Sequence, residues 1–245
     1  MIHTILLLII AVAPGLGVAV FLYIKDKYEP EPIRTLVMAF ALGLAAFFVS
    51  LGMSFTLKSL VTINETDLTQ LFFKAFVVVA LMEELGKFLF IRGVIFYHAD
   101  FNEPLDGIVY AVMIGMGFAT AENLIYVFFS DGGGGAGIVR MFTAIPAHAF
   151  FAILMGYFMG RAKYAINWSK NFIYSFLGLL VAVFFHGIYD YFIFISFVPG
   201  IWIISFVALF IAFLISGKAI QLMQRISPFK PADPEHTEDQ EHEND

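Results

Sequence analysis

The sequence predicts an all-α fold: a polytopic integral membrane helical bundle of about seven transmembrane helices around a buried polar chamber. Two observations lead to this prediction. Of 245 residues, 60% are hydrophobic and 14% are charged, which is about half the charged share of a typical soluble domain. In addition, the hydrophobic residues fall into runs of about 20, the length that a helix needs to cross a bilayer.

The acidic residues are concentrated at the C-terminus. Seven of the twenty lie at positions 233–245, so the net charge of −6 does not describe the rest of the chain. We expect residues 1–226 to form one membrane-embedded domain, residues 227–245 to form an acidic, disordered cytoplasmic tail, and no nucleic acid to bind. The chain has no cysteine, which excludes disulfides, thiolate zinc sites and a cysteine nucleophile.

The first two spans are predicted at about residues 2–24 and 33–57. No basic segment precedes the first apolar run, and Pro14 follows its only small-residue pattern. We therefore interpret it as a retained helix, kinked at Pro14-Gly15, and not as a cleaved signal peptide. A charged, proline-rich segment ends this span, and small residues in the second span favour close helix contacts.

The third and fourth spans carry most of the buried polar residues. The third, at about 71–91, follows a polar loop and contains Glu83, Glu84 and Lys87. A loop then runs to Asp106, which we expect to cap the next helix. The fourth span, at about 107–129, contains Glu122 and Asn123.

The last three spans follow a flexible glycine loop predicted at 131–137. They are expected at about 138–160, 171–194 and 200–217, and the first two of them contain His148 and the pair His186 and Asp190. Lys and Arg residues flank the spans unequally, with ten on the side of the C-terminus and three on the other. The positive-inside rule thus predicts a multi-pass protein of the cell membrane, surrounded by lipids, with its N-terminus outside and its C-terminus cytoplasmic.

Polar residues from four different spans reach a similar depth. At about 1.5 Å per residue they lie about 11–20 Å from the outer ends of their spans. Ionisable residues inside a membrane are costly and by default mark a functional site. The sequence therefore predicts a reaction chamber lined by six candidate catalytic residues, which are Glu83, Glu84, Glu122, His148, His186 and Asp190.

Two hydrolytic mechanisms suit these residues. Glu83 or Glu84 could activate a water molecule, while the imidazoles of His148 and His186, the latter held by Asp190, stabilise the oxyanion. Alternatively, a divalent metal such as zinc could be bound by two imidazoles and one carboxylate, from His148, His186 and Glu122. Because the adjacent glutamates already provide a base, we favour the metal-free mechanism.

Structural and non-enzymatic interpretations stay open from the residues alone. Glu83 and Lys87 could form an ion pair that only offsets its own burial, and His148 could bind a carbonyl freed by Pro146. A secondary transporter or proton-coupled channel could use the same acids and histidines, although the polar groups lie at one depth and no inverted repeat is evident. A non-catalytic membrane chaperone or immunity protein would keep the fold without needing the acids.

Several motifs resemble the PrsW family of intramembrane proteases. They lie between about residues 70 and 192 and are Glu83-Glu84-x-x-Lys87, Phe118-x-x-x-Glu122 with Asn123, His186-x-x-x-Asp190, Asn102-Glu103-Pro104-Leu105-Asp106-Gly107 and Pro146-Ala147-His148. That family is similar to the CAAX prenyl endopeptidases and bacteriocin-immunity-type membrane proteases, whose motifs are EExxxR, FxxxH and HxxxN/D. Lys87 and Glu122 depart from this wider pattern.

The resemblance implies a function. It implies that residues 1–226 form a protease domain that hydrolyses a peptide bond of a membrane protein near the outer face. The implied substrate is a single-pass anti-sigma factor, cleaved at site 1 in a stress response. The matching motifs also make Lys87 and Asn123 supporting residues of the site.

Overall fold

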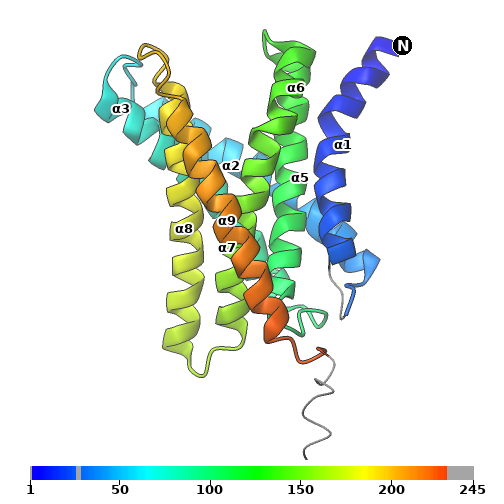
Figure 1. The fold of residues 1–245 in the computed structure, drawn as a ribbon. Helices are drawn as coiled ribbons and strands as arrows, with labels where there is room; N and C mark the ends of the chain where they lie inside the picture. Colours follow the sequence, from blue (N-terminus) through cyan, green and yellow to red (C-terminus); the bar gives the residue numbers. More distant parts are fainter. Residues whose placement is uncertain (1, 26–28, 231–245) are drawn as a thin grey trace, which may run out of the picture.

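The computed structural model describes residues 2–25 and 29–230, which form a bundle of helices with no β-strand among them (Figure 1). The all-α membrane fold is therefore confirmed. The predicted tail lies outside the described residues from position 231 onward. The elements are α1 (Ile2–Lys25), α2 (Ile33–Leu60), α3 (Leu68–Phe73), η1 (Lys74–Leu81), α4 (Met82–Gly93), η2 (Ile95–Tyr97), α5 (Asp106–Phe129), α6 (Gly133–Phe142), α7 (Ala144–Lys163), α8 (Trp168–Phe194) and α9 (Ile203–Arg225).

The predicted spans correspond to helices, but two of them are divided. Among the described residues, five helices are long and apolar enough to cross a membrane alone: α1, α2, α5, α8 and α9. Helices α6 and α7, which meet at a bend of 40°, pass the same test when they are taken together as one span. The predicted span at about 71–91 is formed by α3, η1 and α4, which follow one another directly, with η1 a π-helix. About seven spans thus remains a fair description.

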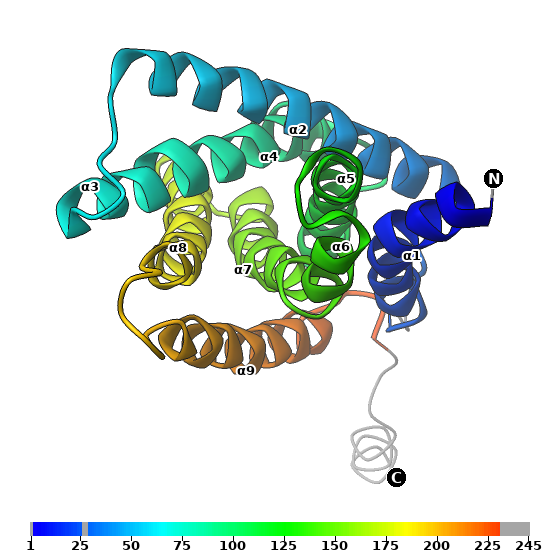
Figure 2. The ribbon, with the colours of Figure 1, turned by 90° about the horizontal axis from the view of Figure 1, so that it is seen from above.

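Helix α5 is the centre of the bundle. In its apolar stretch 83% of the residues are buried, against 22% in α1 and 33% in α9. Seen from above, α1 and α2 lie on one side of α5, while α7 lies between α5 and α8, and α9 crosses outside α7 and α8 (Figure 2). Residues on α5 and α7 are therefore the ones best shielded from lipid.

Glycines let α5 and α7 approach closely. A Cβ added at Gly156 of α7 would lie 2.3 Å from the carbonyl oxygen of Gly107, at the start of α5. One added at Gly160 would lie 2.1 Å from the carbonyl oxygen of Pro104. Because even a methyl group does not fit, glycine is required here, as at other tight crossings of membrane helices. This crossing holds the two helices that carry Glu122 and His148.

The glycine loop predicted at 131–137 is wrong, because α6 already begins at Gly133. Glycine is a poor helix former, but these glycines are packing residues. A Cβ at Gly134 would lie 2.8 Å from the Leu7 side chain of α1, and one at Gly137 would lie 2.4 Å from Val127 of α5. Contact with the neighbouring helices outweighs the low helix propensity of the segment.

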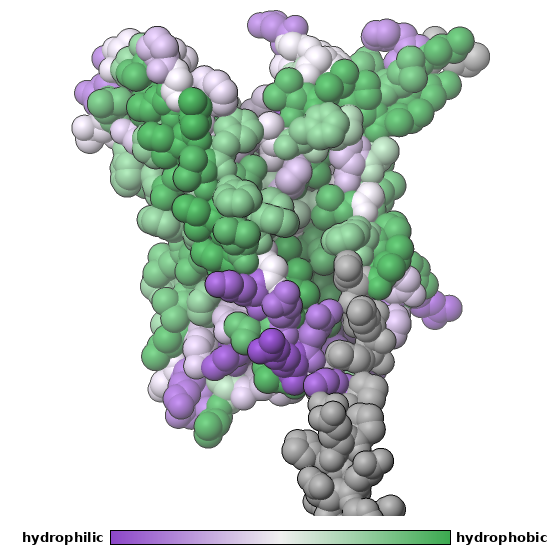
Figure 3. Space-filling model, in the orientation of Figure 1, coloured by the Kyte–Doolittle hydropathy of each residue, from purple (hydrophilic) through white to green (hydrophobic). Residues whose placement is uncertain are grey.

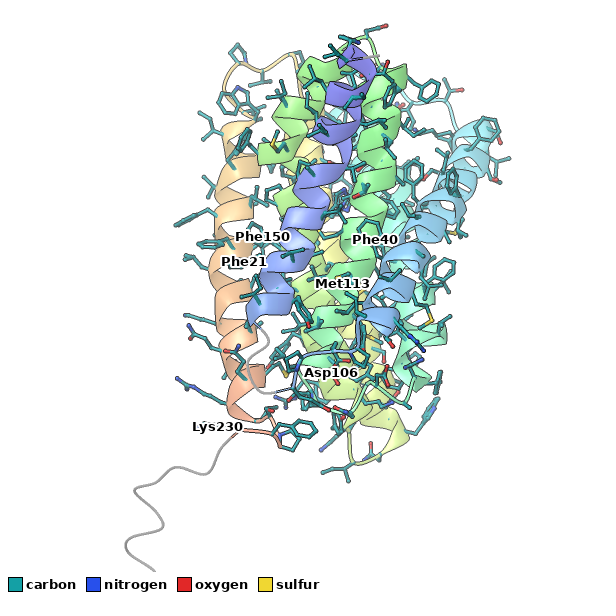
Figure 4. All side chains as sticks on the ribbon, turned by 90° about the vertical axis from the view of Figure 1, so that its right-hand side faces the viewer. Phe21, Phe40, Asp106, Met113, Phe150 and Lys230 are labelled. Atoms are coloured by element: carbon teal, nitrogen blue, oxygen red, sulfur yellow. The ribbon has the colours of Figure 1, made fainter. Side chains whose placement is uncertain are left out.

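Asp106 does not act as the predicted cap of α5. It is the first residue of that helix, and its Oδ2 accepts the backbone N–H groups of Asn102 and Glu103, each at 2.7 Å. The side chain therefore closes the turn before the helix. Figure 4 labels Asp106 near the end of the bundle where the chain leaves α9.

Most of the outer surface of the bundle is apolar. Figure 3 shows hydrophobic residues over the length of the helices, with a large group of hydrophilic residues toward the lower end and smaller groups at the upper tips. Large hydrophobic side chains are exposed along the outermost helices, for example Phe48, Phe55, Phe184, Phe210 and Phe213. Such a surface suits lipid tails, as expected for a multi-pass membrane protein.

Candidate active site

The two adjacent glutamates lie just after a π-helix. η1 ends at Leu81, and Glu83 and Glu84 lie in the first turn of α4. Local π-helical turns inside α-helices occur frequently at functional sites. Ser54 of α2 donates a hydrogen bond of 2.8 Å to the carbonyl of Val78, so part of the altered backbone bonding is satisfied by the neighbouring helix.

Glu83 and Glu84 face different surroundings, as their separation of about 100° around a helix predicts. Glu83 lines a cavity of about 910 Å³. Glu84 is 0% exposed and lies behind the cavity, where its Oε1 is 2.7 Å from Lys87 Nζ and 2.8 Å from His186 Nδ1. The ion pair considered from the sequence, Glu83 with Lys87, is thus replaced by Glu84 with Lys87, because these two residues share the buried face of α4.

The cavity brings together residues from all four predicted spans that carry candidate catalytic residues. Its wall includes Glu83, Glu122, His148, His186 and Asp190, contributed by α4, α5, α7 and α8. Lys58 and Lys74 lie on its wall near the connection between α2 and α3, and Gly132 lies there near the start of α6. The cavity thus runs from these connections at one end of the bundle to the buried acids and imidazoles.

His186 is held at both ring nitrogens. Nδ1 lies 2.8 Å from Glu84, while Nε2 lies 3.3 Å from Asp190 Oδ2 and 3.9 Å from Glu83 Oε2. The ring of Phe151 stacks against the imidazole at a centroid distance of 5.1 Å. Nδ1 donates to Glu84, whereas Nε2, which faces Asp190 and Glu83, donates to a carboxylate when it is protonated and offers a lone pair when it is not.

His148 lies between a cation and a carboxylate. Its Nδ1 is 3.0 Å from Lys87 Nζ, and its Nε2 is 2.9 Å from Glu122 Oε2. Since an ammonium group can only donate, Nδ1 accepts and the proton lies on Nε2, facing Glu122. The alternative in which this ring binds a carbonyl near Pro146 is therefore wrong.

Arg140 is a cavity residue that the sequence did not point to, being one of the three Lys and Arg residues on the side opposite the C-terminus. Its guanidinium lines the cavity, forms an ion pair with Glu122 and donates from Nε to Asn123 Oδ1 at 3.2 Å. Asn123 in turn donates to the carbonyls of Ile10 and Ala11 of α1, at 3.3 and 3.2 Å. Asn123 thus connects Arg140 to α1.

Three of the side chains could hold a metal ion. Glu83, His148 and His186 each offer a ligand atom, and these atoms lie within 4.8 Å of one another, the one such group among the described residues. Glu122, the carboxylate that the sequence analysis placed in the metal set, is instead engaged by Arg140 and His148. The structure therefore favours Glu83, in place of Glu122, as the carboxylate grouped with the imidazoles of His148 and His186.

The donor set fits a divalent metal such as zinc, which takes imidazole nitrogen and carboxylate oxygen at catalytic sites. Glu83 Oε2 is buried and has no hydrogen-bond partner. The Nδ1–H group of His186 donates to Glu84 Oε1, and such a second hydrogen bond is the usual support for a metal-binding histidine. His148 is the exception, because its Nε2 bears a proton shared with Glu122 and would have to lose it to become a ligand.

Comparison with known proteins identifies the family. Residues 31–216 match the family model described as PrsW family intramembrane metalloprotease. The chain belongs to the PrsW family. It is 32% identical over 180 residues to Protease PrsW of Geobacillus kaustophilus (strain HTA426), covering 74% of this chain and 76% of that protein. No solved structure matches the chain.

Two other PrsW proteins resemble this chain to about the same degree. Protease PrsW of Clostridioides difficile (strain 630) is 33% identical over 194 residues, which cover 78% of this chain and 80% of the relative. Protease PrsW of Bacillus subtilis (strain 168) is 29% identical over 184 residues, covering 74% and 79%. The resemblance to PrsW and the prediction of a membrane peptidase are thus confirmed, and the transporter and chaperone alternatives are set aside.

Proposed function

We propose that this PrsW protein is a metal-dependent intramembrane endopeptidase whose divalent ion is held by Glu83, His148 and His186. The grouping of these three ligands on the wall of a membrane-embedded cavity carries the proposal. The description of the family as metalloproteases supports it and reverses our preference for a metal-free mechanism. When bound, such an ion supplies a Lewis acid that activates water and polarises a peptide carbonyl.

Residues around the ligands supply the proton transfers and the positioning. Asp190 faces the cavity and has no basic partner besides His186 in the described structure, so we assign it the role of general base. Glu84 positions His186, and Lys87 positions His148. Glu122 is partly neutralised by Arg140, which suits it to orient His148 and not to accept a proton.

We propose that the substrate is a single-pass membrane protein cut near the outer face. The motifs resemble those of a family that cleaves an anti-sigma factor at site 1, and we extend that substrate class to this chain. A cavity of about 910 Å³ is large enough for a few residues of an extended peptide. Its position between the bundle end and the membrane interior suits a cleavage site near one surface.

We propose further that the end with the cavity mouth faces outward. The N-terminus, the α3 region and the start of α6 lie together at the upper end in Figure 1. Arg92, Arg161, Lys163 and Lys170 lie in or beside the connections at the opposite end. The positive-inside rule places that basic end in the cytoplasm.

The proposed function is tested with purified full-length protein and candidate single-pass substrates in membranes. We expect about one metal ion per chain, loss of that ion in His148→Ala, and no cleavage in Glu83→Gln or after chelation. Glu65→Gln is the matched control, since Glu65 is exposed and does not line the cavity. Cleavage that survives chelation in protein without metal would contradict the metal mechanism and restore Glu83 as a base.

A further inference from the structure

A second cavity lies at the basic end of the bundle, between the end of α4 and the first half of α8. It measures about 410 Å³ and shares no lining residue with the cavity of the candidate active site. Apolar side chains form most of its wall, including Phe88, Phe172, Phe176 and Leu179. Arg92 and Trp168 also line it. We call this cavity the α4–α8 groove.

Arg92 brings a fixed positive charge to the groove. Its Nη1 donates to Tyr97 Oη at 2.6 Å, its Nη2 donates to Asn171 Oδ1 at 3.0 Å, and the guanidinium lies 4.0 Å from the ring centre of Phe96. No Asp or Glu of the described residues lies within ion-pair distance of it. An oriented guanidinium that keeps three of its five donors and has no acid partner among the described residues is suited to bind a phosphate.

Aromatic rings continue the groove along α8. Trp168, Phe172 and Phe176 are spaced one helical turn apart, and their rings stack in succession with centroid distances of 5.7 and 6.3 Å. They are 76%, 56% and 47% exposed, so the stack faces the surroundings of the helix. Trp and Tyr side chains are typical of the interface between membrane and water, which places Arg92 at headgroup level and the phenylalanines at the level of the acyl chains.

We propose that the α4–α8 groove binds one anionic phospholipid, with its phosphate on Arg92 and one acyl chain along the aromatic side chains of α8. Charge complementarity selects this occupant, because Arg92 has no acid within ion-pair distance among the described residues, and a second cation, Lys163, lies 5.4 Å from the ring centre of Phe96 that Arg92 also contacts. Arg–phosphate hydrogen bonds are charge-assisted and can be bidentate. The volume lies within the range of small-molecule sites. The inference does not depend on the proposed peptidase mechanism.

The first test uses native mass spectrometry of the full-length protein titrated with phosphatidylglycerol or phosphatidylcholine. We expect wild type to retain phosphatidylglycerol in preference to phosphatidylcholine, and Arg92→Gln to weaken that binding about tenfold or more. Arg34→Gln should bind like wild type, since Arg34 is exposed at the same end and does not line the groove. Equal binding of phosphatidylglycerol by Arg92→Gln and Arg34→Gln would overturn the proposal.

A second variant keeps the arginine and blocks the space. A Cβ at Gly93, on the groove wall, meets no atom within 4 Å, so Gly93→Leu should fold and fill the groove. We expect it to lose retained phosphatidylglycerol, while Gly217→Leu, at an equally open position on α9, keeps it. Lipid retention in Gly93→Leu would show that the groove is not a phospholipid site.

Discussion

At the residue scale, the adjacent glutamates should respond differently to the same substitution. Glu83→Gln removes a cavity carboxylate that has an unpaired oxygen, so proteolysis should fall by orders of magnitude while protein abundance stays near wild type. Glu84→Gln leaves Lys87, which is 1% exposed, without its counter-charge. Breaking a buried pair in this way lowers the free energy of unfolding by about 3–5 kcal/mol, so the abundance of Glu84→Gln should fall. Cleavage assays and quantitative immunoblots of the same membranes measure both effects.

A double variant is the control for this difference. Replacing both charges, in Glu84→Gln with Lys87→Met, removes the unpaired ammonium and should recover part of the lost abundance, though not the activity. If Glu84→Gln accumulates normally, or if the double variant accumulates no better than the single one, the buried pair is not what stabilises this part of α4.

Arg140 should be required for activity although it is no candidate ligand. Arg140→Gln removes the ion pair to Glu122 and the hydrogen bond to Asn123, and hydrogen bonds to charged groups are each worth about 1.5–3 kcal/mol. Since Glu122 in turn binds His148, we expect kcat to fall about tenfold or more. Arg140→Lys should retain only part of the rate. The positive charge remains, but the planar set of guanidinium donors is lost.

Metal content separates positioning from general damage in these Arg140 variants. Arg140→Gln should still bind the ion that His148→Ala loses, because Arg140 contacts Glu122 and none of the three ligands. Normal turnover in Arg140→Gln would show that the Arg140–Glu122 pair has no part in the reaction.

Most of the acids and imidazoles that line the cavity could be found from the sequence, because carboxylates and imidazoles stand out inside apolar runs. The ion-pair partners of these residues could not be predicted from the sequence. Whether Lys87 pairs with the third or fourth residue before it depends on which face of α4 is buried. Glu83 is the proposed ligand in place of Glu122 because Arg140 forms an ion pair with Glu122. Arg140 itself gave no signal, since a cation near a span end is ordinary.

At the element scale, hydropathy predicted the helices well because bilayer thickness fixes their length. It failed where packing decides the local structure. The helix α6 depends on contacts of Gly134 and Gly137 with α1 and α5, and such contacts between segments distant in sequence are not visible in composition. The π-helix η1, supported by Ser54 of α2, is a second example.

The close crossing of α5 and α7 can be tested with one methyl group. Gly156→Ala would place its Cβ 2.3 Å from a backbone oxygen and 2.7 Å from the Cα of Ile108, so the helices must separate. We expect a loss of stability of about 1–3 kcal/mol, as for other overpacked sites. Thermal unfolding in detergent, followed by circular dichroism, measures the loss.

Gly52→Ala is the matched control for this crossing. It lies on the exposed surface of α2, and an added Cβ meets no atom within 4 Å. Because alanine is the better helix former by about 1 kcal/mol, Gly52→Ala should be neutral or slightly stabilising. Equal melting temperatures for the two variants would mean that α5 and α7 are not locked by this contact.

At the scale of the whole molecule, the two ends of the bundle have different chemistry. The cavity with the candidate metal ligands is reached from the end that holds α3 and the start of α6. The α4–α8 groove and most basic connections lie at the other end. The direction in which the chain crosses the membrane therefore decides which side supplies the peptide substrate.

Single cysteines can determine this direction, because the natural chain has no cysteine and gives no background. Asp131 lies in the exposed turn before α6, and Ile166, which is 90% exposed, lies between α7 and α8 at the basic end. We expect a membrane-impermeant maleimide to label Asp131→Cys in intact cells and Ile166→Cys only after permeabilisation. The reverse pattern would place the cavity mouth in the cytoplasm. A substrate segment cut near the outer face could then not reach Glu83, and the proposed substrate class would be wrong even if the metal mechanism held.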